Sequence, residues 1–84
     1  SNTVIEKIRG MSFYHMEKFD STIQCLKRID DYEKNHTLCY YIGVSYYKSE
    51  PQQEAQKFLS LAITNSQPKD LASYYSYLAF SYDL

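Results

Sequence analysis

Apolar residues recur at steps of three and four along most of this chain, which is the spacing of helices that bury one face. Ile23, Leu26 and Ile29 are the clearest example, and similar runs precede and follow them. The Tyr-rich stretch 74–77 favours a strand by residue propensity alone. No segment alternates convincingly with period two, however, so the pattern predicts an all-α protein with five helices.

Capping residues place the first two helices. Thr3 and Glu6 form a capping box at the start of the first helix, which we expect to end near Glu17–Lys18. Asp20 or Ser21 caps the second helix.

The same signals place the other three helices. Asn35 caps a third helix that reaches about Lys48, and Pro51 lies in the first turn of a fourth. The stretch 65–68 ends the fourth helix, and Asp70 caps a fifth that runs to the last residue. The predicted elements therefore form short helical hairpins followed by an unpaired helix.

An internal repeat connects these hairpins. Residues 10–13 (GMSF) line up with residues 43–46 (GVSY), and Leu26 falls on Leu59, each 33 residues on (43 − 10 = 59 − 26 = 33). A third, incomplete copy begins near Leu78-Ala79. A period in this range is typical of stacked solenoids, whose units bury their apolar faces against their neighbours.

The repeat resembles the tetratricopeptide repeat (TPR) family, whose 34-residue unit has a Leu-Gly pair, a following aromatic residue, two later Ala residues and a closing Pro. The second unit carries the best match, in Ile42-Gly43, Tyr46, Ala55, Leu59, Ala62 and Pro68. The first unit departs from the pattern at Arg9, Thr22 and Ile29.

The resemblance implies an α-α superhelix of about two and a half repeats. We assign repeat 1 to residues 3–35, repeat 2 to 36–68 and a partial repeat 3 to 69–84, within a single domain 1–84. Because the third unit contains only its first helix, we expect the chain to be a fragment of a longer protein.

In this family the first helix of each pair lines a concave groove that binds peptides or extended partner segments. Carried over by register, the groove-facing residues are Lys7, Met11, Tyr14 and His15 in the first unit, Tyr40, Val44, Tyr47 and Lys48 in the second, and Ser76 and Phe80 in the third. Ten Tyr in 84 residues suit such a surface, because tyrosine combines a large ring with a hydroxyl group. The alternative is that half or more of the tyrosines only fill contacts between helices.

Composition and motifs argue against several classes of function. The net charge of −1 gives no electrostatic reason to expect nucleic-acid binding, and no apolar run approaches the ~20 residues of a membrane span. His36, Cys39 and Cys25 are too few for a structural zinc site, and no Gly-rich phosphate loop or catalytic pair is recognisable. We expect no enzymatic activity, no cofactor and no metal. The compartment stays open, with the cytoplasm favoured.

The sequence therefore predicts a non-catalytic scaffold that binds a peptide or helix of another protein in an aromatic groove. One alternative is a structural or self-association role, with a homo-oligomer formed through the C-terminal helix and its Tyr75, Leu78 and Tyr82. Another is the sensory region of a larger bacterial regulator, which the family resemblance alone suggests.

Overall fold

The computed structural model describes residues 2–82, apart from the side chain of Pro68, and every regular element in that range is helical. The α-helices are α1 (Thr3–His15), α2 (Phe19–Leu26), α3 (His36–Ser49), α4 (Gln52–Thr64) and α5 (Leu71–Ser81), with 3₁₀ helices η1 (Tyr32–Lys34) and η2 (Pro68–Asp70). The predicted all-α class is confirmed. The predicted end of the fifth helix falls on residues outside the described ones, and α5 ends at Ser81.

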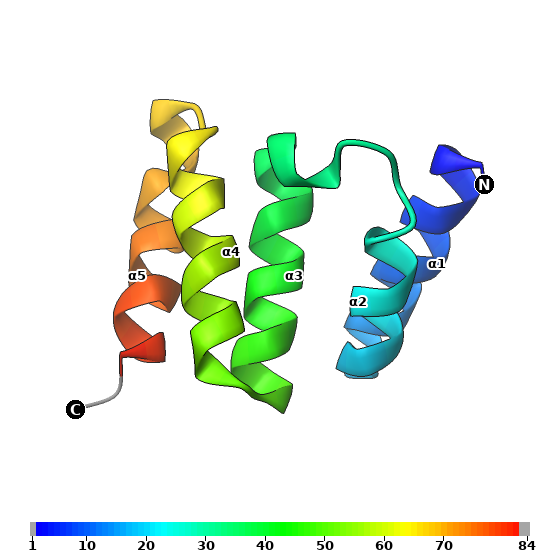
Figure 1. Ribbon diagram of the computed structural model, residues 1–84, viewed down its shortest axis with the longest axis horizontal. Coiled ribbons are helices and arrows are strands. Elements are labelled where there is room, and N and C mark those ends of the chain that lie inside the picture. The colour runs from blue at the N-terminus through cyan, green and yellow to red at the C-terminus, as the bar shows by residue number, and fades with distance from the viewer. Residues whose placement is uncertain (1, 83–84) are drawn as a thin grey trace.

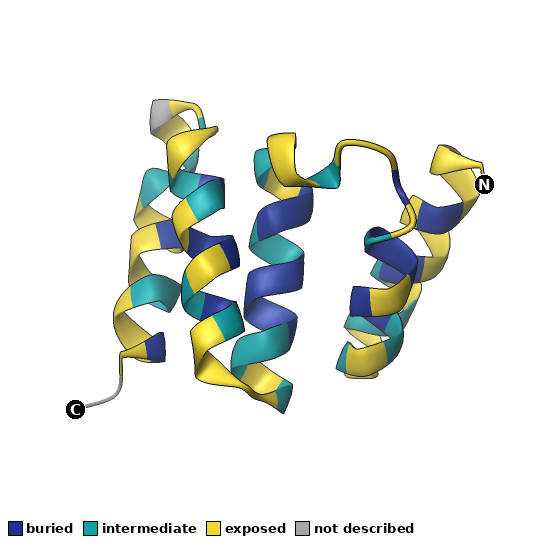
Figure 2. Ribbon diagram, in the orientation of Figure 1, coloured by how far each residue is buried: buried dark blue, intermediate teal, exposed yellow. Residues whose placement is uncertain are grey.

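The helices stand side by side in a row that measures 37 × 25 × 18 Å, with α1 and α5 at opposite ends of the long axis (Figure 1). Each helix packs against the next one in sequence, and α5 also returns to contact α3. The central α3 is the most enclosed helix, as its dark blue and teal ribbon in Figure 2 shows.

Two glycines mark the closest approach of the helices within each hairpin. A Cβ atom added to Gly10 would lie 2.5 Å from Cδ2 of Leu26 on α2. A Cβ atom added to Gly43 would lie 2.8 Å from Cγ and 3.1 Å from the backbone nitrogen of Leu59 on α4. The two glycines and the two leucines are each 33 residues apart in sequence, so the repeat is also a repeat of packing.

Two glutamates repeat in the same register, at the turns inside the hairpins. Glu17 and Glu50 have positive φ angles of 59° and 73°, which are uncommon for non-glycine residues, and Glu50 combines this with an extended ψ of 155°. After α1, the Lys18 N–H donates to the Phe13 carbonyl at 2.9 Å, which is the bond of a Schellman motif. Pro51 occupies the matching position after α3 and has no N–H to donate. Because the chain turns at Glu17, α1 ends before the predicted boundary at Glu17–Lys18.

The residues at which the helices start agree only in part with those predicted from the sequence. Asn35 caps α3 as predicted, since its Oδ1 accepts a hydrogen bond from the Leu38 N–H at 3.1 Å. The prediction that Thr3 caps the first helix is wrong. The cap is Asn2, whose Oδ1 accepts from the Val4 N–H at 2.9 Å, so Thr3 is already helical.

Three further starts differ from the prediction. α2 begins at Phe19, one residue before Asp20, and no side chain caps it, so neither Asp20 nor Ser21 has the predicted role. Asp70 precedes α5 as predicted but makes no capping hydrogen bond. Pro51 precedes α4 and does not lie in its first turn.

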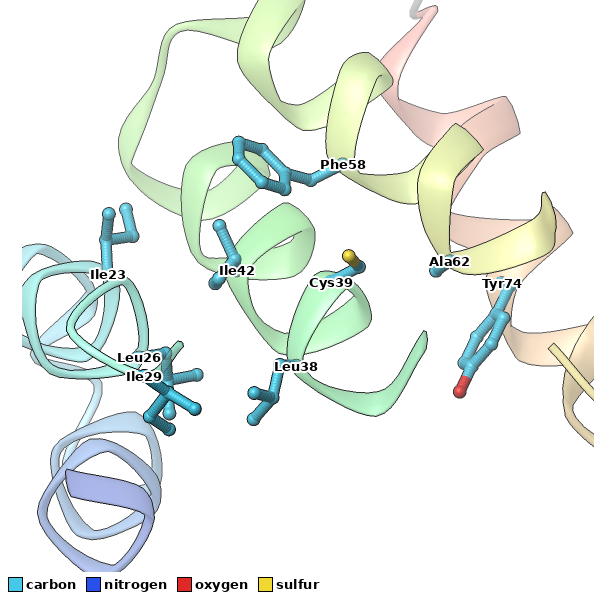
Figure 3. Close-up of a cluster of buried hydrophobic side chains, with 9 residues drawn as sticks. All are labelled: Ile23, Leu26, Ile29, Leu38, Cys39, Ile42, Phe58, Ala62 and Tyr74. Atoms are coloured by element: carbon cyan, nitrogen blue, oxygen red, sulfur yellow. The ribbon is translucent and has the colours of Figure 1, made fainter. Parts of the chain in front are cut away.

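The main core lies around α3 and joins both hairpins to α5 (Figure 3). Its buried residues come from α2 and the segment after it, from α3, from α4 and from α5: Ile23, Leu26, Ile29, Leu38, Cys39, Ile42, Phe58, Ala62 and Tyr74. Both cysteines are free and buried. Burial raises the pKa of the Cys39 thiol to about 11, which disfavours the reactive thiolate at neutral pH.

Gly43→Ala is expected to lower the free energy of unfolding by about 1–3 kcal/mol, because the new methyl group meets the backbone of α4 at Leu59. Gly10→Ala should cost less. Its closest contact is a terminal side-chain atom of Leu26, which can move, and alanine also raises helix propensity by about 1 kcal/mol. Urea unfolding followed by circular dichroism measures both, with Ser12→Ala at an exposed position of α1 as a control.

The close approach itself is tested by combining Gly43→Ala with Leu59→Ala. The shortened side chain relieves part of the clash, so the cost of the alanine should be smaller in this background. A Gly43→Ala variant as stable as the unmodified chain would contradict the packing described above.

Candidate functional site

Aromatic rings from α1, α3 and α5 gather on one side of the molecule, which we call the tyrosine face. Its members are Tyr14 from α1, Tyr40, Tyr41 and Tyr47 from α3, and Tyr74, Tyr77 and Phe80 from α5. Helices that are not consecutive in sequence therefore contribute to one surface.

The rings form a continuous chain of contacts. Tyr14 meets Tyr41 edge to face with ring centres 4.8 Å apart, and Tyr41 meets Tyr40 at 5.1 Å. Tyr40 stacks on Tyr74 at 4.7 Å and touches the edge of Tyr77 at 5.9 Å. Such pairs contribute about 0.5–1.5 kcal/mol each beyond the burial of their area, so the rings also hold α1, α3 and α5 together.

The chain of rings continues along α5 and rests on a small apolar floor. Tyr77 contacts Tyr47 at 5.9 Å and Phe80 at 5.7 Å. Beneath the rings, Val44 is buried in one cluster with Leu59. Val44, which the repeat register places among the groove-facing residues, is fully enclosed and does not reach the surface. It supports the rings and has no area to offer a partner.

The tyrosine face is hollowed in two adjoining places near the N-terminal ends of α3 and α5. The first hollow, of about 260 Å³, is lined by Lys7, Met11, Asn35, Thr37, Leu38 and Tyr41. The second hollow, of about 330 Å³, is lined by Thr37, Tyr40, Tyr41, Lys69, Asp70, Ser73 and Tyr74. Because Thr37 and Tyr41 line both, the two hollows lie next to each other.

The structure brings most of the predicted groove residues to this face. Lys7 and Met11 line the first hollow and Tyr40 lines the second, while Tyr14 and Tyr47 belong to the chain of rings. The remaining predicted residues are exposed or at the end of the chain of rings: His15, Lys48, Ser76 and Phe80.

The sequence reasoning missed several residues of the site. Tyr41 was not among the predicted groove residues, but it is only partly buried and lines both hollows. Tyr77 is three residues before the predicted Phe80, so helical spacing could have found it. Asp70 was considered only as a helix cap.

Three polar side chains, those of His36, Asp70 and Tyr74, lie close together at the wall of the second hollow. The His36 Nδ1 and the Tyr74 hydroxyl are hydrogen-bonded at 2.7 Å. The Asp70 Oδ2 is 3.7 Å from the same nitrogen, and this buried oxygen has no hydrogen-bond partner among the described residues. Burial, and secondly the charge of Asp70, raise the pKa of Tyr74.

The phenols in the middle of the face are held neutral. Burial raises the pKa of Tyr40 to about 12, with a further contribution from the neighbouring Tyr14 and Tyr77. Burial, followed by the proximity of Tyr77 and Tyr41, also raises the pKa of Tyr14. At physiological pH these side chains are therefore uncharged rings with hydroxyl groups that can donate or accept hydrogen bonds.

Among residues 2–82, no three His, Cys, Asp or Glu side chains come together as a metal site. No helix in that range is long and apolar enough to cross a membrane. Comparisons of the chain with protein-family models, with curated proteins and with solved structures give no match.

The raised pKa of Tyr40 predicts an alkaline loss of stability. The folded chain keeps the phenol proton up to about pH 12, whereas an unfolded tyrosine loses it near its ordinary value of 10.0. The contribution of Tyr40 is therefore fully present below pH 10 and is lost as the pH rises from about 10 through 12. Urea unfolding at a series of alkaline pH values should show a shallower loss for Tyr40→Phe.

Urea unfolding of both proteins at neutral pH is the control for this comparison. Tyr40→Phe keeps the ring and its stacking on Tyr74 and removes only the hydroxyl group. An equally steep alkaline loss in both proteins would contradict the assignment of the raised pKa to Tyr40.

Proposed function

We propose that this chain is a non-catalytic scaffold that binds a peptide or helix of another protein on its tyrosine face. The supporting observation is the continuous chain of rings across three helices, with two adjoining hollows in it. Binding surfaces commonly combine a few rigid aromatic side chains with polar groups at their rim.

We also propose that the helices form a TPR-like hairpin solenoid, with the tyrosine face as its groove. The repeated contact of Gly10 with Leu26 and of Gly43 with Leu59 supports this arrangement, as do the positive φ angles of Glu17 and Glu50 at matching positions. In stacked hairpins of one geometry, the first helices of successive units share one side of the stack.

The rings supply the binding energy in this proposal. Tyrosine offers a large contact area and loses little rotamer entropy when it binds, and its hydroxyl group sets the register of the partner by hydrogen bonds. Tyr47 and Phe80 would remove water from apolar groups of the partner, while the exposed Lys48 lies near the rim. Met11 gives the first hollow a flexible apolar wall that adapts to different side chains.

The proposal predicts that Tyr47→Ala and Met11→Ala weaken binding at least tenfold, because each removes apolar contact area from the face. Peptides are selected on the unmodified chain from a displayed random library, and their affinities for each variant are measured by calorimetry. Matched controls are Tyr75→Ala and Met16→Ala, which truncate exposed residues outside the two hollows.

Circular dichroism of each variant establishes that the helices are retained. Unchanged affinity in both Tyr47→Ala and Met11→Ala, or an equal loss in both controls, would contradict the assignment of the tyrosine face as the binding surface.

A second function, self-association, is favoured by apolar side chains exposed on α5. Tyr75 lies on α5 and is 54% exposed, and Tyr82 directly follows this helix and is 53% exposed, at one end of the row. Exposed apolar patches at an accessible surface are typical of interfaces between proteins.

Under this second function the chain forms dimers through α5. Sedimentation equilibrium should then show a mass that rises with concentration, and a Tyr75→Ser, Tyr82→Ser variant should remain monomeric. A single monomeric species of the unmodified chain at all concentrations would exclude this function.

A further inference from the structure

We propose that the second hollow binds a positively charged side chain of the partner, and that this side chain is an arginine. This inference rests on the proposed function, since it names the chemistry of the partner at one place on the tyrosine face. Three features of the hollow support it: its aromatic lining, the Asp70 carboxylate with an oxygen that has no hydrogen-bond partner, and the neighbouring hydroxyl groups.

The lining provides aromatic surfaces for a cation. Tyr40, Tyr41 and Tyr74 all contribute to the wall of the hollow. The rings of Tyr40 and Tyr41 are inclined at 69° to each other, so they form a corner. The faces of aromatic rings carry a negative potential, and they attract guanidinium and ammonium groups that lie over them.

Asp70 provides the opposite charge. Its Oδ2 is buried without a hydrogen-bond partner, and His36 Nδ1, at 3.7 Å, is too far away for a hydrogen bond. A buried carboxylate oxygen without a donor is unfavourable, because it has lost water and gained nothing in exchange. The side chain as a whole is 27% exposed and lines the hollow, so an incoming cation can approach its exposed part and lie beside the charge of the carboxylate, although the buried Oδ2 itself is not open to the hollow. The partial loss of water strengthens this attraction.

The hydroxyl groups favour arginine over lysine. Thr37 and Ser73 also line the hollow, and their oxygens can accept hydrogen bonds beside the carboxylate. A guanidinium group has five N–H donors in one plane and stacks well on aromatic rings, whereas an ammonium group has three donors. Lys69 lies at the same hollow and is exposed, so its charge opposes the incoming cation.

The probe for this site is a capped tripeptide, Ac-Ala-Arg-Ala-NH₂, titrated into the ¹⁵N-labelled chain and followed by NMR. We expect the amide signals of Tyr41 and Ser73 to shift in a saturable manner. The same peptide with citrulline has nearly the same shape without the charge, and it should bind at least tenfold more weakly. Agmatine, a free guanidinium compound, should bind no more tightly than the peptide.

Variants of the chain locate the site. Asp70→Asn keeps the size of the side chain and removes its charge, and it should weaken the arginine peptide at least tenfold. Asp20→Asn makes the same change at an exposed position of α2 and should leave binding unchanged. Lys69→Ala removes the opposing charge and should strengthen binding.

Several results would overturn the inference. These are equal binding of the citrulline peptide, unchanged binding in Asp70→Asn, preference for a glutamate tripeptide, or tighter binding of agmatine, which would indicate a site for free amines. The peptides selected on the whole face test the proposed function separately. If they depend on Tyr47 and the arginine tripeptide still fails to bind, only the assignment of the second hollow is wrong.

Discussion

The contact of a glycine with a leucine on the following helix is the constraint on which the rest of this structure depends. Gly10 and Gly43 have no side chain to separate the helices, so α1 lies close to α2 and α3 lies close to α4. Because the two hairpins share this spacing and are stacked in order, α1, α3 and α5 can share a face. The tyrosine face is built from rings on these three helices.

Much of this architecture could be predicted from the sequence, because helical periodicity and the 33-residue register are both long-range patterns. The details at the helix ends could not. Asn2 and Thr3 are both good caps, and only the backbone angles of the folded chain decide that Asn2 has this role. The positive φ angles of Glu17 and Glu50 carry no sequence signal, since glycine usually occupies such positions.

The repeat register predicted which side of the helix the site residues face, but it did not predict how deeply each side chain is buried. It placed Tyr40, Val44 and Tyr47 on one side of α3, but the two large rings cover the smaller Val44 and only the rings remain available. Asp70 was hidden for a different reason. It lines the second hollow together with Thr37 on α3, which is 33 residues away (70 − 37), and no local pattern reports such a distant neighbour.

Tyrosine combines two properties that are found together on this face, namely packing between helices and partial exposure to water. Other residue types would provide only one of them. The rings hold three helices together, as the stacking of Tyr40 on Tyr74 does, and all of them except Tyr74 also remain partly open to water. Leucine or phenylalanine at all these positions would pack equally well but would expose a continuous apolar patch, which favours aggregation. A charged side chain would keep the face hydrated and could not be half buried at low cost. A neutral phenol satisfies both demands, and the raised pKa of Tyr40 and Tyr14 follows from that same half-buried position.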